Sequence, residues 1–215
     1  MHEIGNAVTL INSSLQMIET AHPEVHSYKY WDTTMEDMKY LRHLLTEVSL
    51  YNTSHILSLS QINPEHLLRS TAASFECTNP DIRIAIETEN SLPSIKCDQT
   101  RLRQVFINLL KNASEALNGI PDALIKLALY RSPDNNRQII LTVTDNGCGM
   151  SPEQLETSFL PMVTYKSTGT GLGLSISRKI IEAHGGSLTV TSALHQGTTF
   201  TITLPIEPDP SKTTN

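Results

Sequence analysis

The spacing of apolar residues changes near Tyr51, and this change divides the chain into two parts that we expect to fold differently. Two runs before Tyr51 place apolar residues three or four positions apart: Ile4, Val8, Ile11, Leu15 and Ile18, then Met35, Met38, Leu41, Leu45 and Val48. This period predicts two amphipathic helices, joined around residues 22–31. Two helices alone cannot cover an apolar seam on each of them. We therefore expect the hairpin to pair with a second copy in a dimeric four-helix bundle.

Short β-rich runs alternate with helical stretches after Tyr51. Strands are predicted at His55–Ser60, Ile82–Thr88, Leu124–Tyr130, Gln138–Thr144, Ser187–Thr191 and Thr198–Leu204. Helices are predicted at Pro64–Glu76, Asp98–Leu117 and Gly171–Ala183. This mixture predicts an α/β sandwich with helices on one face of the sheet, and an α+β fold class for the whole chain. We expect the hairpin to span residues 1–52 and the sandwich to span 53–206, followed by a disordered tail at 207–215.

The charge and cysteine content narrow the range of partners. The net charge is -6, and the lysines and arginines are scattered, which argues against a surface for nucleic acid or anionic lipid. The three cysteines lack metal-ligand or redox spacing, so we expect a reducing compartment and no zinc. No apolar run approaches the roughly 18 residues of a membrane span, and no signal peptide is visible. We expect a soluble, cytoplasmic chain without a membrane contact. Whether a longer parent protein is anchored in a membrane is left open by this reasoning.

Half of the ten glycines lie between Gly147 and Gly173. They form two clusters, DNGCGM at residues 145–150 and GTGLGL at residues 169–174. Glycine lets backbone N–H groups approach a phosphate, and the second cluster leads into a predicted helix whose N-terminus favours negative charge. Each cluster taken singly also suits a tight connection. The dinucleotide-binding fingerprint fails, because no acidic residue follows a strand at the required distance.

The helix predicted before these clusters carries a polar face. Asn108, Asn112 and Glu115 are separated by four and three residues, so they share one side of the helix. Carboxamide oxygens suit a magnesium ion that keeps most of its ligands as phosphate and water. Without the glycine clusters, this face would be interpreted as two solvated asparagines.

Five motifs stand in the order found in one family of signalling enzymes. NLLKNASEA (108–116), DNGCGM, FLPMVTYK (159–166), GTGLGL and GTTFT (197–201) together resemble the ATP-binding domain of sensor histidine kinases. The resemblance covers about residues 55–205. The hairpin before it, which opens with HEIGNAVT at residues 2–9, resembles the dimerisation and phosphoacceptor segment of that family. The NASEA and PMVTYK stretches are most similar to its nitrogen-regulator and sporulation-kinase branch.

The resemblance implies ATP and Mg²⁺ as ligands of the α/β part. It implies that Asn112 coordinates Mg²⁺, that Asn108 stands beside it near the phosphates, and that Lys111 contacts a phosphate. Asp145 would accept a hydrogen bond from the adenine amino group. The base would be admitted by two glycines, Gly147 and Gly149.

The resemblance also implies a lid over the phosphates. Lys166 would face the terminal phosphates, and Thr198 or Thr199 would lie near the adenine. One loop would wrap the triphosphate: Gly169, Thr170, Gly171, Leu172 and Gly173. The alternative for the lid is an exposed loop without nucleotide contacts.

His2 lies on the polar side of the first predicted helix. With about 100° of turn per residue, His2 points roughly 160° away from the apolar seam, and Asn6 lies within about 40° of His2. The resemblance implies that His2 attacks the γ-phosphate, that Glu3 orients it or acts as its base, and that Asn6 positions water for dephosphorylation of the partner. A neutral imidazole is a good nucleophile when a carboxylate holds its other nitrogen protonated. His43, in the second predicted helix, is the one alternative phosphoacceptor.

Two positions depart from the family pattern. Gly5 stands where a basic residue is common, and Ala7 stands where proline is common, which leaves the balance between kinase and phosphatase activity open. Because Met1 directly precedes His2, we expect more of this helix and a sensor region upstream in the native protein.

The predicted function is an ATP-dependent protein-histidine kinase. It would act as a homodimer, autophosphorylate His2, pass the phosphoryl group to an aspartate of a response-regulator receiver domain, and serve as that regulator's phosphatase. An ATP-gated clamp ATPase of the same superfamily, without a phosphohistidine, is the first alternative. The second is a binding module that works mainly as a phosphatase of the receiver domain.

Overall fold

The computed structural model describes residues 2–166 and 169–208. The chain divides into two compact units, Met1–Thr53 and Ser54–Asn215, which are described separately. Most of the segment expected to be disordered, residues 209–215, lies outside the described residues. Within the described ranges, no helix is both long enough and apolar enough to cross a membrane.

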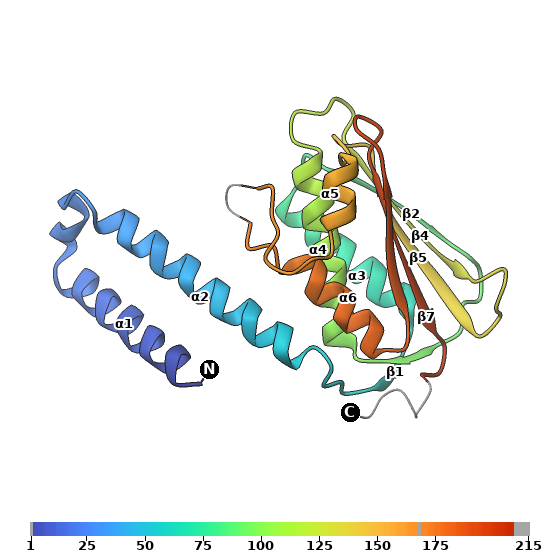
Figure 1. Ribbon diagram of the computed structural model, residues 1–215, viewed down its shortest axis with the longest axis horizontal. Coiled ribbons are helices and arrows are strands. Elements are labelled where there is room, and N and C mark those ends of the chain that lie inside the picture. Colours follow the sequence, from blue (N-terminus) through green and yellow to red (C-terminus); the bar gives the residue numbers. More distant parts are fainter. Residues whose placement is uncertain (1, 167–168, 209–215) are drawn as a thin grey trace. The chain divides into compact units, whose positions relative to one another are not determined.

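The first unit is a helical hairpin of α1 (His2–Ala21) and α2 (Trp31–Thr53) (Figure 1). The junction between them contains a short 3-10 helix, η1 (Pro23–Ser27), whose proline fixes the first turn. Val8 and Asn12 of α1 are buried in the hairpin, as is Met38 of α2. Much of the predicted seam stays uncovered, and its exposed members are Ile4, Ile11, Ile18 and Leu41.

The second unit is built on a five-stranded sheet in the order β2-β4-β5-β7-β6. Its strands are β2 (Arg83–Thr88), β4 (Leu124–Arg131), β5 (Gln138–Asp145), β6 (Ser187–Ser192) and β7 (Thr198–Pro205). β2 pairs with β4 in parallel, whereas the other neighbours are antiparallel. Residues along β5 and β7 alternate between buried and half-buried, as expected when one face of a sheet carries the core.

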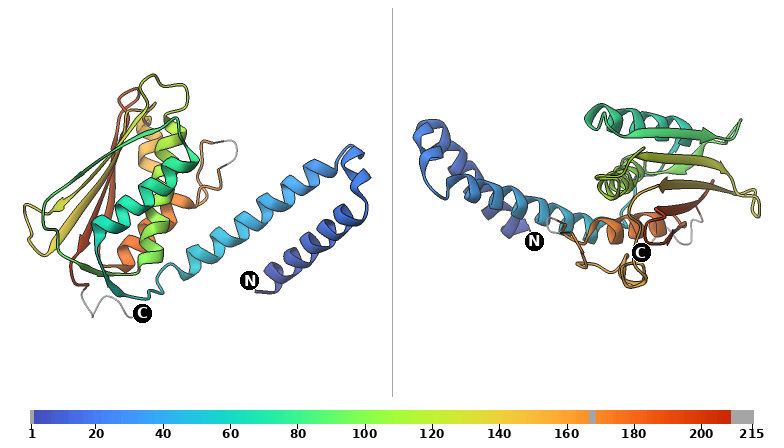
Figure 2. Two further views of the ribbon diagram at one scale, coloured as in Figure 1. Left: turned by 180° about the vertical axis from the view of Figure 1, so that it is seen from behind. Right: turned by 90° about the horizontal axis from the view of Figure 1, so that it is seen from above.

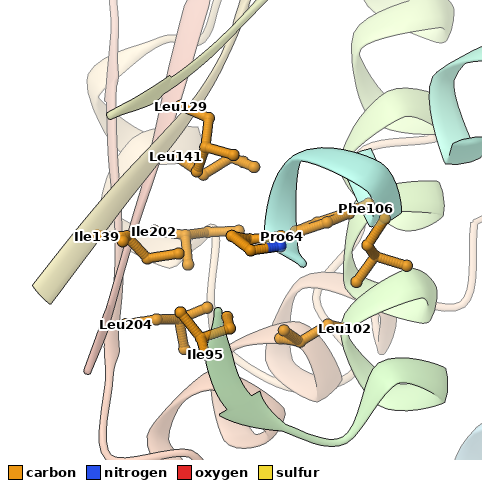
Figure 3. Close-up of a pocket in the computed structure, with 10 residues that line it drawn as sticks. Pro64, Ile95, Leu102, Phe106, Leu129, Ile139, Leu141, Ile202 and Leu204 are labelled. Carbon is orange, nitrogen blue, oxygen red and sulfur yellow. The ribbon is translucent and has the colours of Figure 1, made fainter. Parts of the chain in front are cut away.

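The helices of this unit lie on one face of the sheet, as Figure 2 shows. They are α3 (Pro64–Thr78), α4 (Gln99–Ala116), α5 (Pro152–Thr157) and α6 (Gly173–Ala183). The apolar core fills the space between α3, α4 and the sheet, where Leu102 and Phe106 face strand residues such as Leu141 and Ile202 (Figure 3). The predicted α+β class and the one-sided arrangement of the helices are confirmed.

The strand predicted at His55–Ser60 is wrong apart from its last residue. Residues 54–59 form a turn and an irregular segment, and β1 (Ser60–Ile62) begins where the predicted strand ends. The N–H of Ser58 donates to Oδ2 of Asp98 at 2.9 Å, so a side chain replaces a ladder partner there. β1 pairs with β3 (Ile95–Cys97), a strand that the sequence did not reveal because it is only three residues long.

Candidate functional site

A buried carboxylate lies at the end of the central strand β5. Asp145 is 4% exposed, and its Oδ1 accepts a hydrogen bond from the N–H of Gly147 at 2.9 Å. Burial raises the pKa of Asp145, while backbone hydrogen bonds from Gly147 and Thr198 lower it, and the raising effect prevails. A carboxylate has about four acceptor positions. This side chain is therefore held in place with acceptor capacity left for a ligand.

The glycines after Asp145 are required by the packing of the protein itself. A Cβ on Gly147 would lie 2.6 Å from the backbone oxygen of Ala116, at the end of α4. Gly149 has a φ of +67°, and a Cβ there would collide with the backbone oxygen of Ala193. The N–H of Cys148, between them, donates to the oxygen of Ala116 at 3.0 Å. The tight connection considered for this cluster is thus present, at one end of the sheet beside Asp145.

The polar face of α4 contacts α6 and the segment at residues 159–166, which is the expected lid. Asn108 donates through Nδ2 to Oγ of Ser177 on α6 at 2.9 Å. Asn112 accepts through Oδ1 from Nζ of Lys166 at 2.8 Å, and the same ammonium forms an ion pair with Glu115. The structure therefore brings together three of the motifs found in the sequence: the asparagine helix, the lid and the start of the GTGLGL helix.

The loop before α6 is joined to the lid by its backbone. The N–H of Met162 donates to the oxygen of Gly171 at 3.0 Å, and a Cβ on Gly171 would lie 2.6 Å from the backbone nitrogen of Val163. Thr170 caps the turn, since its Oγ1 accepts from the N–H of Leu172 at 3.3 Å. The helix predicted from Gly171 begins two residues later, at Gly173, because residues 169–172 form this loop.

Lys111 lies one helical turn before Glu115 on α4. Both residues line a groove between α3 and α4, together with residues such as Phe75 and Arg103. Thr198 is buried at the start of β7, where its Oγ1 lies 3.0 Å from Oγ of Ser192. Thr199 follows it, and its Oγ1 lies 3.0 Å from Oγ1 of Thr144.

The residues present fit a magnesium ion. Asn112 and Glu115 together hold a positive charge, the ammonium of Lys166, on one amide oxygen and one carboxylate. Oxygen ligands of this kind suit Mg²⁺. In the described ranges there is no group of three or more His, Cys, Asp or Glu residues that could hold a metal. A magnesium ion here must therefore take most of its ligands from phosphate and water.

The phosphoacceptor candidates lie at the start of α1. Glu3 and Asn6 are exposed, and His2 belongs to the first turn, although its side chain lies outside the described residues. The rival His43 on α2 is exposed, with Nε2 3.6 Å from Oε1 of Glu47.

One residue of the site was missed from the sequence. Ser177 is 1% exposed and contacts Asn108. The available signal was a serine among the buried residues of the α6 segment, between Ile176 and Ile180.

Comparison with known proteins settles the family. Residues 97–208 match the family described as histidine kinase-, DNA gyrase B-, and HSP90-like ATPase. The chain belongs to this ATPase family. Within it, the chain is 28% identical over 207 residues to sporulation kinase E of Bacillus subtilis (strain 168), covering 95% of this chain and 27% of that relative. The predicted resemblance to sensor histidine kinases is confirmed, for a chain that spans less than half the length of the curated relatives.

Two solved structures are similar to nearly the whole chain. Full-length ShkA in complex with AMPPNP has a TM-score of 0.78 and 26% identity, and the match covers 95% of this chain and 44% of that one. Histidine kinase ThkA in complex with response regulator protein TrrA has a TM-score of 0.68 and 28% identity, with 97% of this chain and 60% of that one covered.

Proposed function

We propose that this chain is the core of an ATP-dependent protein-histidine kinase that autophosphorylates His2. The observation that carries the proposal is the contact of Lys166 with Asn112, two residues 54 positions apart. It joins the lid to the asparagine helix and puts a cation on the amide oxygen expected to face magnesium. Residues 1–52 would form the phosphoacceptor hairpin, residues 53–206 the catalytic domain, and residues 207–215 the tail.

Nucleotide recognition begins with Asp145. Its buried carboxylate accepts a hydrogen bond from the adenine amino group, and a fixed acceptor of this kind discriminates against bases that lack the donor. Gly147 and Gly149 let the chain pack tightly beside Asp145 and so admit the base there, and Thr198 lies beside it. The loop of residues 169–173 directs backbone N–H groups and the N-terminus of α6 toward the triphosphate.

The phosphates are held by α4 and the lid. Asn112 would hold a magnesium ion, with Asn108 beside it, and the ion would neutralise part of the phosphate charge. Lys166 exchanges its contacts with Asn112 and Glu115 for the terminal phosphate. Lys111 is exposed at the edge of the same helix and supplies further positive charge toward the phosphates.

Phosphoryl transfer is the role of the hairpin. One ring nitrogen of His2 attacks the γ-phosphorus and forms an N–P bond, while the bond from that phosphorus to the bridging oxygen of ADP breaks. Glu3 orients the imidazole by accepting the proton of its other nitrogen in a hydrogen bond. The phosphoryl group then passes to a receiver aspartate. In the opposing phosphatase activity, Asn6 positions a water molecule that attacks the aspartyl phosphate and releases inorganic phosphate. The complex of ThkA with a response regulator supports this class of partner.

The active form is proposed to be a homodimer. Ile4 is 58% exposed, Ile11 51% and Ile18 42%, so one face of α1 leaves large apolar side chains in water. These residues recur every seven positions, the spacing of a seam between packed helices. A second hairpin of the same sequence would cover this face in a four-helix bundle.

Acid lability of the labelled protein tests the proposal. Label from γ-labelled ATP should appear on the chain, resist alkali and be lost in acid, and it should disappear in the variant His2→Gln. The matched control His43→Gln should keep the label. Label that persists in His2→Gln would refute the assignment of the acceptor, and ATP hydrolysis without any protein label would favour the clamp ATPase.

A further inference from the structure

The carboxamide of Asn108 is held between two residues of α6. Its Nδ2 donates to Oγ of Ser177 at 2.9 Å. Its other side lies against Gly173, where a Cβ would lie 3.1 Å from Cγ of Asn108 and would collide with Oδ1. The amide nitrogen thus faces Ser177, which lies one helical turn after the first residue of α6. The oxygen lies at the first residue of α6, where the glycine-rich loop ends.

The hydroxyl of Ser177 faces the nitrogen of this amide. Its hydroxyl donates to the backbone oxygen of Gly173 at 3.0 Å. Since a serine hydroxyl has one proton, Ser177 offers Asn108 an acceptor and no donor. Ser177 is 1% exposed, so water has little access to take its place. A reversed amide would bring two acceptors together unless the hydroxyl turned away and gave up its bond to Gly173, and this favours the orientation seen in the structure.

We propose that Ser177 is a positioning residue that fixes the Asn108 carboxamide with its oxygen toward the N-terminal end of α6. This inference rests on the proposed function, which puts the ATP phosphates and magnesium at that end. A fixed amide oxygen can serve the metal or its bound water without a rotation at the moment of binding. Loss of the Ser177 acceptor frees the amide to turn its nitrogen toward the same point.

The same helix provides a matched control. Ser175 is also buried, at 5% exposure, and its hydroxyl donates to the backbone oxygen of Leu172 at 2.8 Å. It has no hydrogen bond to Asn108 in the described part of the chain. Replacing Ser175 by alanine therefore removes a comparable hydroxyl from α6 and leaves the Asn108 contact intact.

Calorimetric titration of the full chain with ATP tests the inference, in Mg²⁺ and again in EDTA. Ser177→Ala should weaken binding in Mg²⁺ about tenfold, the loss expected for one oriented hydrogen bond, and change binding in EDTA less than about twofold. Ser177→Thr keeps the hydroxyl and should restore the affinity. Ser175→Ala should bind as the unmodified chain does, and thermal unfolding should show that the two alanine variants are similarly folded.

A double-mutant cycle separates positioning from a general structural role. In the background Asn108→Ala, the change Ser177→Ala should cause no further loss of affinity in Mg²⁺. The inference is overturned by any of three results: full affinity in Ser177→Ala, an equal loss in Ser175→Ala, or an undiminished loss in the Asn108→Ala background. If the unmodified chain binds no ATP, the proposed function fails as well. Normal binding with an unaffected Ser177→Ala would refute this inference alone.

Discussion

Replacing Asp145 by asparagine should weaken ATP binding and leave the fold intact. Gly147 can still donate to the side-chain oxygen, because asparagine keeps one acceptor in the same shape. The second oxygen becomes an NH₂ group, which would meet the adenine amino group donor to donor. A hydrogen bond to a charged partner contributes about 1.5 to 3 kcal/mol, so the dissociation constant should rise roughly 10-fold to 150-fold.

The same substitution should weaken ATP binding without lowering the stability of the folded protein, because Asp145 is buried. The pKa of Asp145 is raised, so the ionised carboxylate is less favourable in the folded protein than in the unfolded chain. Its contribution to stability is therefore present at low pH and lost as the pH rises through the folded-state pKa. Asp145→Asn removes this dependence, so the variant should be at least as stable as the unmodified chain at pH 7.

Calorimetry with ATP and with GTP, together with urea unfolding at pH 7, measures both effects. GTP carries an oxygen where ATP carries the amino group, so Asp145→Asn should also reduce the preference for ATP over GTP. Asp134→Asn, in an exposed loop of the same unit, controls for the change in net charge and should bind ATP normally. Unchanged ATP affinity in Asp145→Asn, or an equal loss in Asp134→Asn, would refute the adenine contact.

Two further predictions concern the hairpin and a buried histidine. The double variant Ile11→Glu/Ile18→Glu should be monomeric and still bind ATP, whereas the control Gln16→Glu on the same helix should stay dimeric. If sedimentation shows that the unmodified chain is monomeric at micromolar concentration, the four-helix bundle is refuted. Burial lowers the pKa of His184, whose Nε2 accepts from the N–H of Asp98 at 3.0 Å. Its contribution to the unfolding free energy is thus present above the unfolded-state pKa of about 6.5 and lost as the pH falls. Urea unfolding at pH 7.5 and 5.5 should show a smaller pH dependence in His184→Gln, and a slope as steep as in the unmodified chain would exclude this origin.

The sequence predicted the elements that have a strong hydrophobic period. The α4 segment is the clearest case, since Leu102, Val105 and Leu109 repeat at helical spacing and are all buried. β5 and β7 were found because their alternation matches a sheet with one covered face. The segment at residues 55–60 was misassigned because its second half, from Leu57 to Ser60, also alternates. A short run of this kind does not distinguish a strand from an extended connection.

The site was only partly accessible from the sequence. Asn112 stood out because it lies on a repeated polar helix face, whereas Asp145 was named only through the family resemblance. The contact of Ser177 with Asn108 joins residues 69 positions apart and depends on how α6 lies against α4. No local pattern specifies that geometry, so it appears only once the fold is assembled.

The packing around the glycines bears on how inactive relatives can be recognised. Gly147 and Gly149 leave no room for a Cβ, because the backbone oxygens of Ala116 and Ala193 occupy that space. Selection for a stable fold alone would therefore preserve both glycines in a descendant that had ceased to use ATP. No such collision fixes Asp145: an asparagine can also accept the hydrogen bond from Gly147, and a buried carboxylate is itself costly. Among relatives, pseudokinases should thus keep the glycines and lose the aspartate, and a survey that relies on glycines alone would count them as active enzymes.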